Sequence, residues 1–203
     1  GVPDVITSNT ASRELLKKDE LITVTEKGNL IVEKGNFSLP KPILQANRNE
    51  LEKHWKCKLF IHNAPHAILS YLGSLKKYTY IHEAMSDKNI EKVVLGSIKE
   101  ITEGVVRAGY VPKRFAEKYR DMEIKRFKNK LLFDPIARVA REPLRKLSKD
   151  NRIILALRVA QFNKKVPQYT AMGVKAALNY FDENDPESIY LQNIRKSLTD
   201  SEI

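Results

Sequence analysis

A lysine, an asparagine and a histidine lie close together in the stretch KLFIHNAPHAILS, residues 58–70. On a helix, Lys58, Asn63 and His66 would project at about 0°, 140° and 80° around the axis, so all three would share one side. An amine, an amide and an imidazole would then converge among apolar neighbours. Withdrawing a lysine amine from water lowers its pKa, which lets it accept a proton near neutral pH. The stretch is therefore a candidate site for proton transfer.

The same residues have a purely structural interpretation, which the bare pattern favours. In it Lys58 is a surface lysine with its stem on apolar neighbours, Asn63 caps a helix and His66 is a hydrogen-bonded core residue. Pro65 lies between the amide and the imidazole. Because proline cannot donate to the preceding turn and disfavours helical geometry at the residue before it, we expect the helix to kink or restart there.

The elements that position this stretch are mainly helical. Apolar spacing, prolines and capping residues predict helices over residues 43–71, 81–85, 87–108, 112–129, 153–161, 166–181 and 186–197. Asp134-Pro135 is a further helix start. Before these helices, alternation around a glycine-containing turn predicts a small β-hairpin of Ile22–Thr25 against Leu30–Glu33. A short helix is also expected over residues 11–17.

Composition sets the class of protein. A chain of 203 residues with 42% hydrophobic and 30% charged residues is typical of one soluble globular domain. No apolar run is long enough for a bilayer, so no membrane association is expected. The single cysteine, Cys57, excludes an internal disulfide and a cysteine-based metal cluster, and we expect a buried thiol. These features place the protein in the cytoplasm.

The net charge of +11 is unevenly distributed. Residues 111–152 contain fourteen Lys and Arg against six Asp and Glu, so 14 − 6 = +8 lies in this segment. It could form a nucleic-acid face, a site for a small anion or simply solvated helices. Its aromatic residues have the helical spacing of core anchors rather than of stacking platforms: Phe115, Tyr119, Phe127 and Phe133. A helical nucleic-acid-binding module is therefore an alternative hypothesis, and a disfavoured one.

Phosphate-cradling and metal-binding motifs are absent from the sequence. Its eight glycines never form G-x-G-x-x-G or G-x-x-x-x-G-K. The sequence likewise contains no H-E-x-x-H and no ligand types at metal spacing.

Two separated motifs resemble a known family. K-x-x-x-x-N-x-x-H, followed by AxxSYLG and YTYIHEAM, is similar to the C-terminal domain of the polyol-specific long-chain dehydrogenases. The segment RFKN…D…RVAREPLRKLS…R resembles their mannitol-1-phosphate 5-dehydrogenase branch. The resemblance extends from about Leu21 to Gln192. The sequence departs from it at Asn129-Lys130, where many relatives have Asn-Pro, and at Pro65, which replaces a small residue.

The resemblance implies a fold and a domain organisation. Residues 21–203 would form an all-α, multi-helical domain of the 6-phosphogluconate dehydrogenase C-terminal type. Residues 1–20 would be the remnant of a linker from a missing N-terminal Rossmann domain, which binds NAD in this family. The implied activity is NAD-dependent interconversion of mannitol 1-phosphate and fructose 6-phosphate, which this chain alone would not perform. A free polyol or a sugar acid is the alternative substrate.

The resemblance also implies roles for particular residues. Lys58 would be the general base, Asn63 would hold the developing alkoxide, and His66 would bind substrate oxygens and steady the lysine. No metal is implied, because the lysine performs the role of zinc in other alcohol dehydrogenases. Arg138 and Lys146 match substrate-contacting residues of the second motif.

Two further arginines are candidates for a substrate phosphate. Arg141 and Arg145 follow Arg138 in the second motif, and a guanidinium suits a phosphate group. An equally favoured interpretation makes them helix-surface charges or ion pairs with Glu142.

Overall fold

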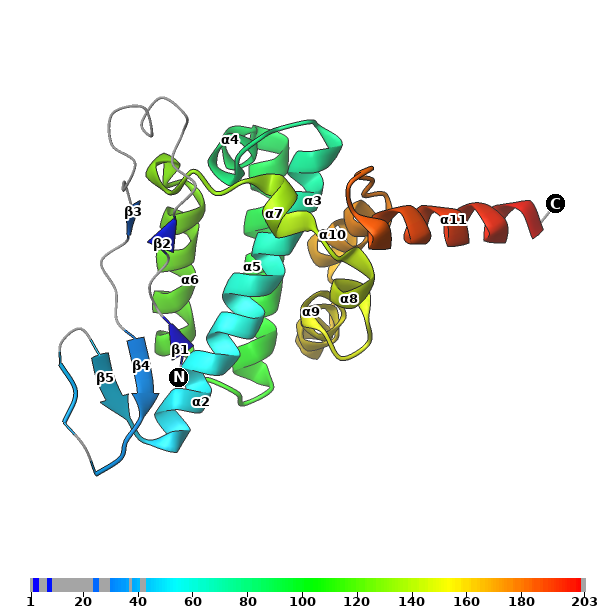
Figure 1. The fold of residues 1–203 in the computed structure, drawn as a ribbon. Coiled ribbons are helices and arrows are strands. Elements are labelled where there is room, and N and C mark those ends of the chain that lie inside the picture. Colours follow the sequence, from blue (N-terminus) through cyan, green and yellow to red (C-terminus); the bar gives the residue numbers. More distant parts are fainter. Residues whose placement is uncertain are drawn as a thin grey trace, which may run out of the picture.

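The structure is a computed structural model that describes residues 2–3, 7–8, 24–25, 30–36, 38–40 and 43–201. As predicted, the fold is mainly helical (Figure 1). Its helical elements are α2 Arg48–Cys57, the π turn η1 Lys58–Asn63, α3 Ala64–Leu75, α4 Ile81–Ser86, α5 Lys88–Arg107, α6 Lys113–Phe127, η2 Lys130–Leu132, α7 Ile136–Ala140, α8 Pro143–Leu147, α9 Arg152–Ala160, η3 Gln161–Asn163, α10 Gln168–Leu178 and α11 Pro186–Ser201.

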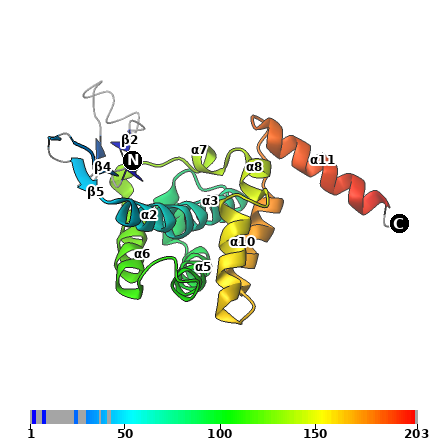
Figure 2. The ribbon, with the colours of Figure 1, turned by 90° about the horizontal axis from the view of Figure 1, so that it is seen from below.

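One long helix runs through the middle of the domain. It consists of α2, η1 and α3, which follow one another directly along the chain. Figure 2 shows α5 and α6 on one side of it and α7 and α8 on the other. Helices α4, α5, α7, α9 and α10 all contact α3, and every residue from Ala64 to Tyr71 is buried. A helix buried on all sides must find partners for its polar side chains inside the protein.

The buried apolar residues form three clusters that share this long helix. Phe60 and Ile61 pack against α5, α6 and α9 in the first cluster. Leu69 packs against α4, α5 and α7 in the second, and Tyr71 packs against α9 and α10 in the third. The position of the long helix is therefore fixed by the core from Cys57 to Tyr71.

Local signals correctly predict most helix starts. Helix α5 begins after Asp87, whose carboxylate accepts the N–H groups of Asn89 and Ile90 at 2.9 and 3.2 Å. Helix α6 follows Pro112, and α11 begins at Pro186. These starts confirm the predicted capping and proline signals.

The helix predicted over residues 43–71 begins later than expected. Ile43–Ala46 is strand β5, and helix α2 begins at Arg48. The Asn47 side chain accepts the Glu50 N–H at 2.9 Å, and the Glu50 carboxylate accepts the Asn47 N–H at 3.4 Å. This capping box sets the helix start, and the apolar spacing upstream of it was misleading.

The predicted β-hairpin is wrong in its pairing. Leu30–Glu33 is strand β4, but it pairs in parallel with β5 and antiparallel with β1, Val2–Pro3. Strand β3, Val24–Thr25, instead pairs with β2, Thr7–Ser8. Alternating side chains indicate that a segment is a strand, but they do not determine which strand it pairs with. Here β1 pairs with one edge of β4 and β5 with the other. The helix predicted over residues 11–17 lies outside the described residues.

Gly104 is a point of close approach between α5 and α9. A Cβ added there would lie 2.1 Å from the Val159 carbonyl oxygen and 2.7 Å from the carbonyl carbon. Because backbone atoms cannot swing aside, we expect Gly104→Ala to lower the free energy of unfolding by about 2 kcal/mol, measured by urea denaturation. Glu103→Ala, exposed on the same helix, should change it by less than about 0.5 kcal/mol. Unchanged stability of Gly104→Ala would contradict this close packing.

Candidate active site

Lys58 and Asn63 are the first and last residues of the π turn η1. A π-helix repeats through i→i+5 hydrogen bonds, so residues five apart lie one turn apart on the same side. On an α-helix they would be separated by about 140°. His66 follows three residues later in the α-helical α3 and lies on the same face as Asn63. The π turn therefore aligns the amine, amide and imidazole more closely than α-helical spacing predicts.

The π turn lies where Pro65 predicts a kink or a restart. Pro65 is in the first turn of α3, and Ala64 keeps helical angles of φ −71° and ψ −53°. Because proline has no N–H to give to the preceding turn, the usual α-helical hydrogen bond is lost there in any case. The chain responds by widening into a π turn and restarting as α3, while α2 and α3 remain one continuous rod (Figure 1).

Lys58 and Asn63 are half-buried, and Phe60, Ile61 and Ala64 beside them are buried. The first turn of α3, which the structure describes in full, donates no backbone N–H to the Asn63 side chain. The interpretation of Asn63 as a helix cap is therefore wrong.

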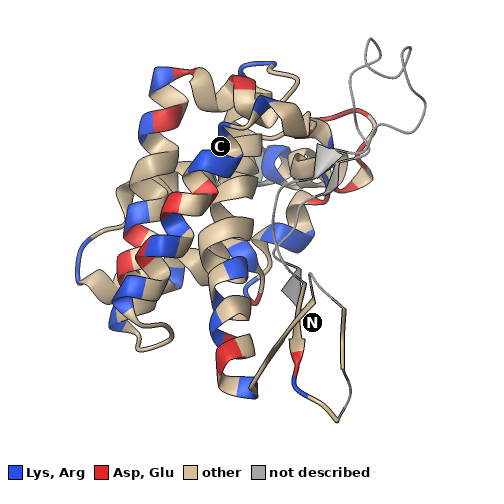
Figure 3. Cartoon of the chain, turned by 90° about the vertical axis from the view of Figure 1, so that its left-hand side faces the viewer, with Lys and Arg blue, Asp and Glu red and all other residues tan. Residues whose placement is uncertain are grey.

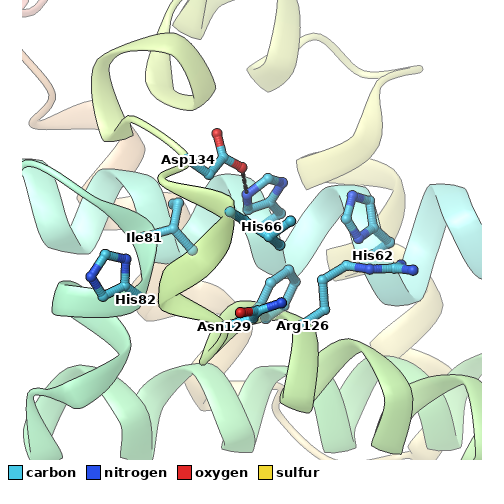
Figure 4. Close-up of a pocket in the computed structure, with 9 residues that line it drawn as sticks. His62, His66, Ile81, His82, Arg126, Asn129 and Asp134 are labelled. Carbon is cyan, nitrogen blue, oxygen red and sulfur yellow. Dashed lines mark ion pairs between the residues drawn. The ribbon is translucent and has the colours of Figure 1, made fainter. Parts of the chain in front are cut away.

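His66 is buried and paired with a carboxylate. Its Nε2 lies 3.0 Å from Oδ2 of Asp134, and its ring stacks on Phe127 at a centroid distance of 5.2 Å (Figure 4). Burial lowers the pKa of His66, although the Asp134 hydrogen bond opposes this. A neutral imidazole that donates Nε2–H to Asp134 keeps Nδ1 as a hydrogen-bond acceptor. His66 is thus prepared to accept a hydrogen bond from a hydroxyl group.

Asp134 is held in place from several directions. Phe133 has a left-handed conformation (φ 44°, ψ 42°) that turns the chain immediately before it. The Asp134 carbonyl accepts the Ile81 N–H at 3.0 Å, and Arg138 Nε donates to its Oδ1 at 3.1 Å. Burial acts to raise the pKa of Asp134, but the bonds from His66 and Arg138 outweigh it and the pKa is lowered. The Asp134 carboxylate therefore links Arg138 to His66.

A second imidazole lies one turn before His66, and sequence reasoning missed its role. His62 Nδ1 lies 2.6 Å from Oε2 of Glu123, and Arg126 donates to the other oxygen of this fully buried carboxylate. The two imidazole centroids are 5.1 Å apart. The i, i+4 spacing of the histidines was visible in the sequence, but nothing local indicated that Glu123 would be buried against them.

A small cavity adjoins these side chains. Six polar residues line it, namely His62, His66, His82, Arg126, Asn129 and Asp134 (Figure 4). Its free space of about 10 Å³ is about that of one water molecule, far too small for a sugar. Lys58 and Asn63 are not among its lining residues. A sugar that meets all three predicted catalytic residues would therefore lie outside this cavity.

Lys146 of the second motif is buried. Its Nζ donates to the Val139 carbonyl at 2.8 Å and also to the Arg141 carbonyl. Burial, and then the nearby Arg152 and Arg145, lower its pKa to about 8. Its amine therefore ties α8 to the end of α7, and a contact with substrate remains a prediction.

Arg141 and Arg145 are exposed and both face Glu142. Arg141 Nε lies 3.8 Å from Oε1, and Arg145 Nε donates to Oε2 at 2.5 Å. The ion pairs expected by the structural interpretation are thus present. A role in phosphate binding remains a prediction, since ion pairs at the surface are easily exchanged.

The basic segment does not form one continuous cationic face. Figure 3 shows Asp and Glu interspersed among Lys and Arg over the helices. Several of its cations have carboxylate partners, as in the pairs Lys113–Glu117, Arg120–Asp121, Arg126–Glu123, Lys128–Glu91 and Arg138–Asp134. This arrangement further disfavours the nucleic-acid hypothesis.

Three other expectations concern cysteine, metals and membranes. Cys57 is a buried free thiol, and burial raises its pKa to about 12. In the part of the chain that the structure describes, no three His, Cys, Asp or Glu side chains converge as metal ligands. None of the described helices is long and apolar enough to cross a membrane.

The buried histidines predict a stability that falls in mild acid. Burial lowers the pKa of both His66 and His82, so below about pH 6.5 the unfolded chain binds protons that the folded chain does not. We expect the free energy of unfolding, measured in urea, to fall between pH 7 and pH 5. Asp134 and Glu123, whose pKa values are lowered, add a second loss below about pH 4.

Two variants separate the contributions of the histidines to this slope. His66→Gln and His82→Gln should each make the decline between pH 7 and pH 5 shallower, by at most about 1.4 kcal/mol per pH unit. A stability that is flat over this range, or a slope that neither variant changes, would contradict the assignment.

Comparisons with known proteins agree with the motifs. A profile of the family described as "Mannitol dehydrogenase C-terminal domain" matches residues 50–201. The mannitol-1-phosphate 5-dehydrogenase of Caldanaerobacter subterraneus subsp. tengcongensis is 36% identical over 144 residues, which are 71% of this chain and 37% of that protein. The protein of the same name from Buchnera aphidicola subsp. Acyrthosiphon pisum is 34% identical over 191 residues, 92% of this chain and 49% of that protein. This chain therefore spans less than half the length of either relative.

A solved structure shares the fold. Pseudomonas fluorescens mannitol 2-dehydrogenase, in a ternary complex with NAD and D-mannitol, matches 94% of this chain and 42% of its own with a TM-score of 0.65 and 20% identity. This likeness confirms the predicted fold class, and the profile match confirms the resemblance seen in the motifs. The chain belongs to the mannitol dehydrogenase family, and residues 50–201 correspond to the C-terminal domain of that family.

Proposed function

We propose that this chain is the substrate-binding and catalytic domain of an NAD-dependent oxidoreductase that interconverts mannitol 1-phosphate and fructose 6-phosphate. The observation that carries the proposal is the π turn that begins at Lys58 and ends at Asn63, with His66 in the buried helix that follows it. The names of the two relatives support the choice of substrate.

The three residues divide the work on the reacting hydroxyl group. Lys58 removes its proton, since it is half-buried in η1 and an amine that is partly withdrawn from water is suited to act as a base. Asn63 donates its amide N–H to the developing alkoxide, as a preorganised donor does. His66, held by Asp134, accepts a hydrogen bond at Nδ1 from a neighbouring hydroxyl and so orients the sugar.

The cofactor is assigned to another part of the protein. When bound, NAD would accept the hydride from the carbon whose hydroxyl group gives its proton to Lys58. The donors in this chain suit the oxygens of a polyol, and its sequence contains no glycine-rich dinucleotide turn. We therefore assign NAD to an N-terminal Rossmann domain that packs against this one, with residues 21–203 as the substrate domain and residues 1–20 as the linker. We also propose a cytoplasmic location, since Cys57 is a free thiol.

The second motif supplies the rest of the substrate site. In this proposal Arg138 and Lys146 contact the sugar hydroxyls, and Arg141 and Arg145 bind the phosphate. Both arginines are exposed, so a phosphate can reach their guanidinium groups. A free polyol or a sugar acid is the alternative substrate within the same family.

Replacement of Lys58 tests the base. In the complete protein with its cofactor domain, we expect Lys58→Ala to lower kcat by about 10²- to 10⁴-fold, because the proton loses its acceptor. Lys56→Ala is the matched control, since the Lys56 amine lies 4.6 Å from the centroid of the Tyr110 ring, and it should stay within a few-fold of the wild type. A near-normal rate for Lys58→Ala would show that another group is the base.

A substrate panel tests the reaction and the need for a second domain. With NAD fixed, the complete protein should oxidise mannitol 1-phosphate with a kcat/KM at least about 100-fold above that for mannitol, because charged hydrogen bonds hold the phosphate. The present chain alone should show no turnover of either. Faster oxidation of mannitol or of a hexonate would establish the alternative substrate class.

A further inference from the structure

The region between α7 and α9 holds cations that repel one another. Burial, followed by Arg152 and Arg145, lowers the pKa of Lys146, and burial, followed by Arg145, lowers the pKa of Arg152. Cations that disfavour one another's charge make the local potential more positive, and Glu142 and Asp185 partly offset this effect at Lys146.

The carboxylate of Glu142 lies among these cations. Glu142 places Oε1 3.8 Å from Arg141 Nε and Oε2 2.5 Å from Arg145 Nε. The hydrogen bond from Arg145 lowers the pKa of Glu142, so its carboxylate is charged at neutral pH. One side chain thus bridges the two guanidinium groups assigned above to the phosphate.

The backbone holds Glu142 in this bridging position. Its angles are φ 60° and ψ 59°, a left-handed conformation that is uncommon for residues other than glycine. Its N–H donates to Asp185 Oδ2 at 2.8 Å, and the Arg145 N–H donates to Glu187 Oε2 at 3.0 Å. Residues at the start of α11 therefore stabilise the loop that places the carboxylate between the arginines.

We propose that Glu142 occupies Arg141 and Arg145 before the substrate binds and competes with the substrate's phosphate for both guanidinium groups. This inference rests on the proposed function. A phosphate carries nearly two charges and three acceptor oxygens, so it displaces a carboxylate that makes only solvent-exposed ion pairs. The carboxylate of a sugar acid must displace Glu142 at the same cost, so the competition lowers the affinity for either anion by the same factor.

The test measures affinity rather than turnover. Inorganic phosphate is titrated into the complete protein by calorimetry, with Glu142→Gln, Arg145→Gln and the control Glu103→Gln, which makes the same charge change at an exposed position on α5. Glu142→Gln should bind phosphate about 2- to 5-fold more tightly than the wild type, which is the range of a surface ion pair. Arg145→Gln should bind it about 10-fold more weakly, and Glu103→Gln should be unchanged.

Gluconate provides the second arm, because it carries a carboxylate in place of the phosphate. Glu142→Gln should raise the affinity for gluconate by about the same 2- to 5-fold factor, because displacing Glu142 costs the same for either anion. If Arg145→Gln weakens phosphate binding while Glu142→Gln leaves it equal or weaker, the carboxylate orients the arginines and the competition is refuted, although the proposed substrate stands. If neither Arg145→Gln nor Arg141→Gln changes phosphate affinity, both the competition and the phosphate-binding role of these arginines are refuted.

Discussion

Burial of α3 on every side is the constraint on which the rest of this structure depends. Its apolar side chains are accommodated because they pack into the three clusters. The polar side chain of Ser70 is satisfied within the helix, since its hydroxyl group donates to the Ala67 carbonyl. The imidazoles of His62 and His66 cannot be satisfied locally, so each takes a carboxylate from a distant segment. Those carboxylates in turn bind Arg126 and Arg138. The chemistry proposed for this domain is thus tied to the packing of one helix.

These buried pairs also link the site to the surrounding elements. Glu123 comes from α6, and Asp134 from the turn before α7, where Phe133 and the bond to Ile81 fix its backbone. A buried charge without its partner is far more costly than an exposed one, commonly by about 3–5 kcal/mol. Asp134 therefore cannot withdraw from His66 without penalty, and the same carboxylate binds Arg138 of the second motif. The two motifs are separated in the sequence but form one hydrogen-bonded unit.

Sequence reasoning succeeded where a short stretch determines the structure. Asp87 and Pro112 marked the starts of α5 and α6, and the apolar stripe of α5 is indeed buried. The grouping of Lys58, Asn63 and His66 as a catalytic set, inferred from the same short stretch, stays a prediction. Sequence reasoning failed where contacts between distant segments determine the structure. The strand Leu30–Glu33, for example, pairs with β5 rather than with the predicted strand. The π turn is an intermediate case, because Pro65 located the irregularity but did not specify its form.

The π turn also allows the candidate site to tolerate a change in length. Such a turn contains about one residue more than the α-helical turn that it replaces. Removing one residue between Lys58 and Asn63 would restore an ordinary helix in which the amine and the amide are four residues apart, so both would stay on the side of His66. A relative with one residue fewer in this turn should therefore keep the amine on the same side, and an alignment gap placed inside the turn would preserve its assignment.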